Sequence, residues 1–196
     1  RTFVPVMKRL AIFASGSGTN AENISLHFSG NPNISVEVII TNNPEAGVIQ
    51  RAKKLNIPFE VVTRKEFSDS TKVVKLLKDY KIDVIVLAGF LLLVPVALIE
   101  DYKDRIINIH PALLPLFGGK GFYGANVHQK VIETKSLISG ITIHHVNEFF
   151  DDGEIIFQAA CHIAKDDTPE SLAEKIHDLE KMYFPVVIEK FVQQLL

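Results

Sequence analysis

The sequence contains few features that would place the protein outside a reducing compartment, in a membrane or on a nucleic acid. It has a single cysteine, Cys161, which excludes an internal disulfide framework. Its formal net charge of -2 provides no basic field for nucleic acid. The longest apolar stretch, residues 84–99, is interrupted by Gly89 and Pro95 and is shorter than the roughly 18 apolar residues of a membrane-spanning helix. We therefore expect a cytoplasmic protein with neither nucleic-acid nor membrane partners.

The sequence also lacks internal repeats, low-complexity tracts and linker-like segments. Its 196 residues, 47% of them hydrophobic, are enough for one domain with a substantial core. We predict a single domain over residues 7–196. The six residues before Met7 read R-T-F-V-P-V, and we interpret them as a tag or an upstream extension.

Common metal-binding motifs are absent as well. The chain has seven histidines, but it contains no H-E-x-x-H motif and no pair of cysteines. His144 and His145 are adjacent, so on a strand their side chains would point to opposite faces. We therefore expect no metal cofactor.

What the sequence does contain is a regular alternation of strand and helix patterns. Short apolar runs predict strands over residues 10–14, 36–40, 59–62, 84–88 and 106–109. Helical patterns lie between them, from about residue 21 and over residues 44–55, 70–80 and 93–102. This alternation predicts an α/β fold with a doubly wound, mostly parallel, Rossmann-like sheet.

The pattern changes in the C-terminal part of the chain. Predicted strands over residues 141–146 and 154–163 are joined by N-E-F-F-D-D-G, which is too short for a crossover helix, so they should pair antiparallel. A long C-terminal helix follows, with Thr168 as its N-cap and Pro169 as its first residue. Pro185 should kink or split this helix.

Two polar side chains stand at the end of the fifth predicted strand, in the run I-N-I-H-P. Asn108 and His110 are two positions apart, so they project to the same side of a strand, and Pro111 ends the run. They would lie at the carboxyl end of that strand, where open α/β sheets bind ligands. The alternative is a hydrogen-bonded pair that only fixes a loop.

A glycine-rich loop, A-S-G-S-G-T-N, follows the first predicted strand. It matches G-x-G-x-x-G/A, but no carboxylate ends the second strand to hold the ribose of a dinucleotide. Backbone N–H groups at the start of a helix, with the side chains of Ser17, Thr19 and Asn20, would instead suit a small phosphate monoester. A turn whose glycines serve only backbone geometry is the alternative.

Acidic residues in the last third of the chain are further candidates. Asp151 and Asp152 precede Gly153 and would either reach His110 and favour its charged form or belong to an ordinary hairpin turn. His177 and Glu180 are three residues apart and share one face of the last helix. A role for that face requires that it meet the glycine loop.

Four motifs occur together in one order: G-S-G-T-N, L-A-G-F, N-I-H-P-A-L-L-P, and D-D-G after an H-x-V strand. In this order and spacing, from about Met7 to the C-terminus, the chain resembles the phosphoribosylglycinamide formyltransferase family, within the wider formyltransferase superfamily. The resemblance implies the Rossmann-like formyltransferase fold. It also implies transfer of a formyl group from 10-formyltetrahydrofolate to the amine of glycinamide ribonucleotide in purine synthesis, without a metal.

The resemblance also implies roles for individual residues. The catalytic trio would be Asn108, His110 and Asp151, with Asp152 as the competing carboxylate. The residues that bind glycinamide ribonucleotide would be Gly18, Thr19 and Asn20 at the phosphate and Glu180 near the ribose. The residues that bind the folate would be Arg64, Leu91, Leu92, Leu93 and Val94. The partners would be these small molecules alone, and the protein would be a monomer or a homodimer.

Two other functions remain open at this point. A formyltetrahydrofolate hydrolase would deliver the formyl group to water, and a non-catalytic module would only bind a phosphate ligand. The presence of Asn108, His110 and Asp151 argues against the binding module. Formation of folate product with and without glycinamide ribonucleotide distinguishes the transferase from the hydrolase.

Overall fold

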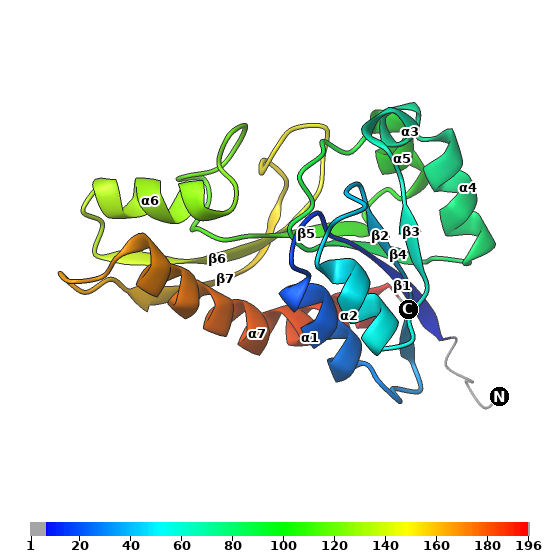
Figure 1. Ribbon diagram of the computed structural model, residues 1–196, viewed down its shortest axis with the longest axis horizontal. Coiled ribbons are helices and arrows are strands. Elements are labelled where there is room, and N and C mark those ends of the chain that lie inside the picture. Colours follow the sequence, from blue (N-terminus) through cyan, green and yellow to red (C-terminus); the bar gives the residue numbers. More distant parts are fainter. Residues whose placement is uncertain (1–6, 196) are drawn as a thin grey trace.

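The computed structural model describes residues 7–195 (Figure 1). The segment 1–6, interpreted as a tag or an upstream extension, lies outside the described residues, as does Leu196. Within the described range, seven strands form one sheet in the order β3-β2-β1-β4-β5-β6-β7. No helix in this range is long and apolar enough to cross a membrane.

The first five strands make the predicted parallel half of the sheet. They are β1 (Lys8–Phe13), β2 (Ile34–Thr41), β3 (Phe59–Val61), β4 (Val84–Leu87) and β5 (Ile106–His110). All neighbouring pairs among them are parallel. Every residue of β4 is buried, because helices cover both faces of the sheet. The prediction of a doubly wound sheet is confirmed.

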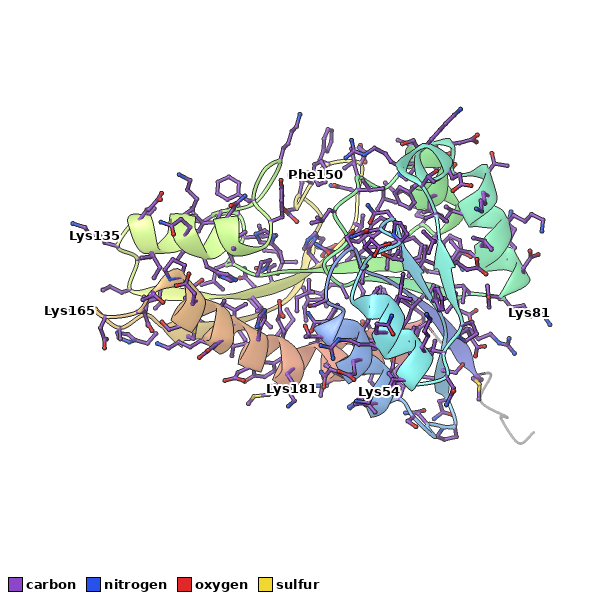
Figure 2. All side chains as sticks on the ribbon, in the orientation of Figure 1. Lys54, Lys81, Lys135, Phe150, Lys165 and Lys181 are labelled. Carbon is purple, nitrogen blue, oxygen red and sulfur yellow. The ribbon has the colours of Figure 1, made fainter. Side chains whose placement is uncertain are left out.

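Helices cover the two faces in separate groups. One face carries α1 (Thr19–His27), α2 (Val48–Lys54), α6 (Ala125–Glu133) and α7 (Pro169–Gln194). The other carries α3 (Arg64–Asp69), α4 (Thr71–Asp79) and α5 (Val96–Asp101), which gather at one end of the molecule in Figure 1. Lysines such as Lys81 and Lys135 lie around the periphery (Figure 2). The sequence patterns did not predict α3 and α6.

The last two strands extend the sheet in the antiparallel sense. They are β6 (Ile138–His145) and β7 (Ile155–His162), and β6 pairs with both β5 and β7. This pairing confirms the predicted change of direction. The strand β5 therefore has a parallel neighbour on one side and an antiparallel neighbour on the other, with Asn108 opposite His144.

Helix α7 begins as predicted and then continues through its proline. The Thr168 side chain accepts a hydrogen bond from the Ser171 N–H, and Pro169 follows the cap. The helix runs past Pro185 to Gln194, so Pro185 does not split it, and a kink at this residue stays a prediction. Pro185 is buried with Phe184 against the core, and this packing offsets the missing hydrogen bond.

A side chain from α1 satisfies the backbone group that Pro185 leaves free. Proline has no N–H to donate to the carbonyl four residues earlier, which is that of Lys181. The Nδ2 of Asn23 donates to this carbonyl oxygen at 3.0 Å. This hydrogen bond therefore ties α1 to α7 close to the glycine loop.

Candidate active site

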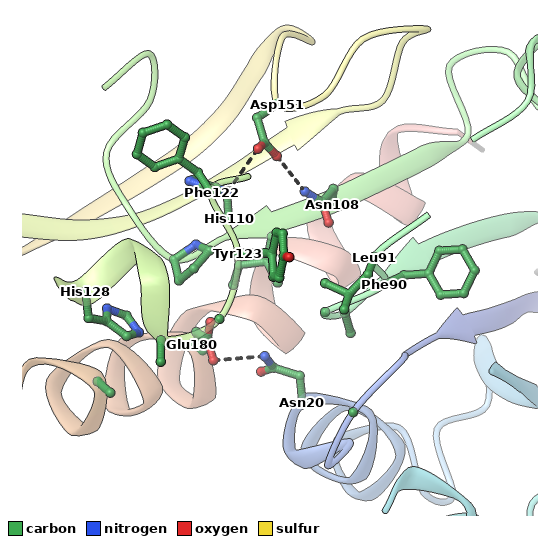
Figure 3. A pocket seen from close by; sticks show the side chains of 18 of the residues that line it. Asn20, Phe90, Leu91, Asn108, His110, Phe122, Tyr123, His128, Asp151 and Glu180 are labelled. Atoms are coloured by element: carbon green, nitrogen blue, oxygen red, sulfur yellow. Dashed lines mark hydrogen bonds and ion pairs between the residues drawn. The ribbon is translucent and has the colours of Figure 1, made fainter. Parts of the chain in front are cut away.

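A cavity of about 710 Å³ opens at the carboxyl ends of β1, β4 and β5 (Figure 3). Its walls come from segments far apart in the sequence: residues 16–20, 88–91, 108–111 and 119–125, the β6–β7 connection and helix α7. The cavity lies where β2 and β4 flank β1 on opposite sides. In open α/β sheets this point, where the strand order reverses, is the usual place for a ligand.

The glycine loop forms one end of the cavity, and its shape requires Gly18. Gly18 immediately precedes α1 with a φ of +76°. A Cβ atom there would lie 2.3 Å from Cγ2 of Val48, at the start of α2. The first helical hydrogen bond runs from the Glu22 N–H to the Gly18 carbonyl, so the N–H groups of Thr19 and Asn20 have no acceptor within the helix. Both residues line the cavity.

Helix α7 meets the glycine loop through Glu180. Asn20 Nδ2 donates a hydrogen bond to Glu180 Oε2 at 2.9 Å (Figure 3). Burial raises the pKa of Glu180, while the hydrogen bond from Asn20 and the nearby His177 oppose the rise. The helix face that His177 and Glu180 share therefore reaches the glycine loop, as a functional role for that face requires.

The structure brings Asn108, His110 and Asp151 together at the other end of the cavity (Figure 3). Nδ1 of His110 lies 3.4 Å from Asp151 Oδ2, and Nδ2 of Asn108 lies 3.5 Å from Asp151 Oδ1. The neighbouring Asp152 instead accepts a hydrogen bond from Asn147 at an exposed position. Of the two adjacent carboxylates, Asp151 is therefore the one that faces His110.

Asp151 is held as a carboxylate. Burial raises its pKa, but the contacts with His110 and His144 and the hydrogen bond from the Gly119 N–H outweigh that effect and hold the pKa well below its usual range. The Gly119 N–H donates to Asp151 Oδ2 at 3.0 Å. A negative charge is thus fixed beside two imidazole rings.

The backbone determines which nitrogen of His110 carries a proton. His110 is 3% exposed, and its Nε2 lies 2.7 Å from the carbonyl oxygen of Phe117. A carbonyl oxygen only accepts, so Nε2 is the donor in this contact. The other nitrogen, Nδ1, is therefore left to exchange a proton beside Asp151.

Two site histidines were not predicted from the sequence. His144 lies 3.0 Å from Asn108 Nδ2 and 3.6 Å from Asp151 Oδ1, both measured from its Nε2. The antiparallel pairing of β5 with β6 was the signal that could have revealed it. His128 lines the cavity from α6, a helix that was also missed, and burial lowers its pKa.

The residues expected to bind the folate do not all reach the cavity. Arg64, at the start of α3, and Leu91 line it, together with Phe90. Leu92, Leu93 and Val94 are not among its lining residues. Val94 is buried in the core under α5, Leu92 packs against that core, and Leu93 is 45% exposed. After Leu91 the chain leads to α5, and Leu92 and Val94 join the core that contains Leu98 of that helix instead of the cavity wall.

Comparison with known families identifies the class of protein that has this arrangement. The model of the formyl transferase family matches residues 8–188. The chain belongs to the formyl transferase family. Its fold, with a parallel half and an antiparallel C-terminal extension, is thereby placed among proteins that move formyl groups.

Relatives of this formyl transferase cover most of its length. A chloroplastic phosphoribosylglycinamide formyltransferase from Arabidopsis thaliana is 43% identical over 93% of this chain and 65% of its own length. The phosphoribosylglycinamide formyltransferase of Bacillus subtilis is 35% identical over 95% of each chain. The crystal structure of the protein of that name from Bacillus halodurans superposes with a TM-score of 0.87 and 39% identity, over 96% of this chain and 97% of that one. This chain spans less than two thirds of the length of the two chloroplastic relatives that it matches.

Proposed function

We propose that this formyl transferase moves the formyl group of 10-formyltetrahydrofolate to the primary amine of glycinamide ribonucleotide, as in purine synthesis. The observation that carries the proposal is the shape of the cavity. A glycine loop suited to a phosphate lies at one end, and Asn108, His110 and Asp151 converge at the other. The names of the relatives, which are phosphoribosylglycinamide formyltransferases, support the formyl transfer and its acceptor.

The ribonucleotide binds along the line between these two ends. Its phosphate occupies the start of α1, where N–H groups of Gly18, Thr19 and Asn20 and the helix dipole favour an anion. The Glu180 carboxyl group, already bonded to Asn20, accepts a hydrogen bond from a ribose hydroxyl. This arrangement directs the amine toward His110.

The folate is a co-substrate that binds beside β4. Phe90 and Leu91 offer apolar surface to the flat pterin, and Arg64 offers a positive charge to an acidic group of the folate. Leu92 and Val94 contribute by packing in the core beside this segment instead of by contact with the folate, and Leu93 is exposed. No step of the reaction requires a metal.

The chemistry is a direct attack that needs no covalent enzyme intermediate. The amine nitrogen bonds to the formyl carbon, and the carbonyl oxygen becomes an oxyanion. The Asn108 amide donates a hydrogen bond to that oxygen, an interaction whose loss typically costs about 3 kcal/mol of barrier, or roughly 100-fold in rate. The bond between the formyl carbon and the folate nitrogen then breaks.

His110 and Asp151 handle the proton in this reaction. The amine loses one proton, which His110 Nδ1 receives, and the departing folate nitrogen gains one from the same atom. Asp151, 3.4 Å away, stabilises the imidazolium between these two transfers. The products are the formylated ribonucleotide and tetrahydrofolate, with no net change in protons.

A product assay tests the proposal. Purified protein is mixed with 10-formyltetrahydrofolate, and the folate product is followed by absorbance with and without glycinamide ribonucleotide. Product only in the presence of the ribonucleotide is the expected result. Equal product without it would make the protein a hydrolase, and absence of product in both would favour a binding module.

A further inference from the structure

His144 is a buried histidine that has no part in the steps described above. It lies on β6 directly opposite Asn108 on β5, and it is 2% exposed. Each of its ring nitrogens has one polar neighbour within 3.0 Å: the carbonyl oxygen of His145 lies beside Nδ1, and the amide nitrogen of Asn108 lies beside Nε2. Asp151 Oδ1 is farther away, at 3.6 Å from Nε2. The two closer contacts determine where the protons are.

The first contact fixes the proton on Nδ1. His144 Nδ1 lies 2.7 Å from the carbonyl oxygen of His145. Because a carbonyl oxygen only accepts, Nδ1 must carry a proton. In a neutral imidazole the other nitrogen, Nε2, then has a free lone pair and is an acceptor.

The second contact fixes the orientation of the Asn108 amide. His144 Nε2 lies 3.0 Å from Nδ2 of Asn108, and an amide nitrogen only donates. A proton on Nε2 would place two donors face to face, so this contact requires the neutral ring. One amide hydrogen is thus held by His144. The second is directed toward Asp151 Oδ1 at 3.5 Å, which is too long for a strong hydrogen bond.

We propose that His144 is a positioning residue that keeps an N–H of Asn108 pointed at the reacting formyl oxygen. The inference rests on the proposed function and deepens it. With the amide held in this way, its weakly bonded hydrogen is ready for an oxyanion between Asn108 and His110. If the amide turned over, its own oxygen would face both the Asp151 carboxylate and the developing negative charge.

A double-mutant cycle tests whether His144 acts through Asn108. His144→Phe removes the acceptor and should lower kcat by about tenfold, less than the roughly 100-fold expected for Asn108→Ala. The KM for glycinamide ribonucleotide should not change, because the oxyanion forms only after binding. In the Asn108→Ala background, His144→Phe should cost less than about twofold. An equal loss in both backgrounds would overturn the proposal.

Two further variants separate positioning from folding. His144→Gln can present an amide oxygen near the place of Nε2, whereas the shorter His144→Asn cannot, so Gln should restore more of kcat than Asn. The reverse order would contradict the proposal even if His144→Phe does not fold. His162→Phe, at an exposed position on β7, is the matched control and should retain the wild-type kcat.

A spectroscopic measurement does not depend on turnover. In long-range ¹H–¹⁵N NMR spectra of the wild-type protein near neutral pH, the His144 signals should show a protonated Nδ1 and an unprotonated Nε2. A protonated Nε2 would overturn the assignment of the acceptor. A protein with the expected spectrum but no ribonucleotide-dependent product would instead refute the proposed function.

Discussion

Asp151 and Asp152 are neighbours in the sequence with opposite environments. The Asp151 side chain is 12% exposed and contacts His110, His144 and Gly119. Asp152 belongs to an exposed turn with Asn147. The backbone of Asp151 adopts a φ of +53°, which is uncommon for residues other than glycine, and so turns one carboxylate inward and leaves the next outside.

This contrast predicts different results for two conservative substitutions. Asp151→Asn should lower kcat by roughly 100-fold or more, since the imidazolium of His110 loses its counter-charge. Asp152→Asn should stay near the wild-type rate. Steady-state kinetics of the two variants, made in parallel, check this, and a larger loss for Asp152→Asn would move the catalytic role to that residue.

Asp151 should also influence how stability depends on pH. Its pKa is lower in the folded protein than in the unfolded chain, where it is about 3.9. The charged form therefore stabilises the fold fully above that value, and this contribution falls as the pH drops toward the folded pKa. Urea unfolding should show that the stability difference between wild type and Asp151→Asn shrinks from about pH 5 to about pH 3. A difference independent of pH would contradict the lowered pKa.

At the scale of elements, the glycine loop and the two helices around it form one unit. Gly18 lets α1 start against α2, and Asn20 and Asn23 bind successive residues of α7, Glu180 and Lys181. The end of the cavity at the glycine loop thus depends on how α1 packs between its neighbours.

Gly18→Ala should destabilise the glycine loop and its two helices more than an alanine substitution at another glycine with a similar φ. Gly18 and Gly30 have φ values of +76° and +74°, but only a Cβ at Gly18 would meet other atoms. Both changes add about 1–2 kcal/mol of strain, and Gly18→Ala adds about 1–3 kcal/mol of overpacking against Val48. Urea unfolding and the affinity for glycinamide ribonucleotide measure the difference. Equal effects of both substitutions would show that the contact with Val48 is relieved without cost.

Asn23 and Pro185 should behave as a coupled pair. Asn23→Ala removes the donor to the Lys181 carbonyl and should cost about 1 kcal/mol of unfolding free energy. In a Pro185→Ala background the new N–H of Ala takes that role, so Asn23→Ala should then cost close to nothing. Chemical denaturation of the four proteins closes the cycle, and additive losses would exclude the pairing.

At the scale of the whole molecule, sequence patterns predicted what depends on local order. The parallel half followed from alternating strands and helices, and Asn108 and His110 followed from two-residue spacing. The pattern did not reveal His144, because its partner lies on another strand 36 residues away. It also missed α6, where the N-cap Gly124 forms no side-chain cap hydrogen bond. The sequence also did not show that Leu92–Val94 lie away from the cavity, because their apolar character does not determine the direction in which the chain runs.

Binding of the ribonucleotide should stabilise the whole protein, because the proposed site joins α1, α7 and the end of β5. A free ligand concentration 100 times Kd should add about 2.7 kcal/mol to the unfolding free energy. Thermal unfolding with increasing glycinamide ribonucleotide measures the shift. A ribonucleoside without a phosphate is the control, and an equal shift with that compound would contradict the role of the glycine loop.

The position of β5, with a parallel neighbour on one side and an antiparallel one on the other, has a consequence for selectivity. The glycine loop proposed to bind the phosphate lies on the parallel side of β5. Asp151, the carboxylate beside His110, lies on the antiparallel side. The hydrogen-bonded strands between them hold the two at a set separation. In the proposed reaction, the sheet therefore selects the acceptor by its length. A phosphorylated amine one bond too short or too long would bind through its phosphate and still fail to reach the formyl carbon.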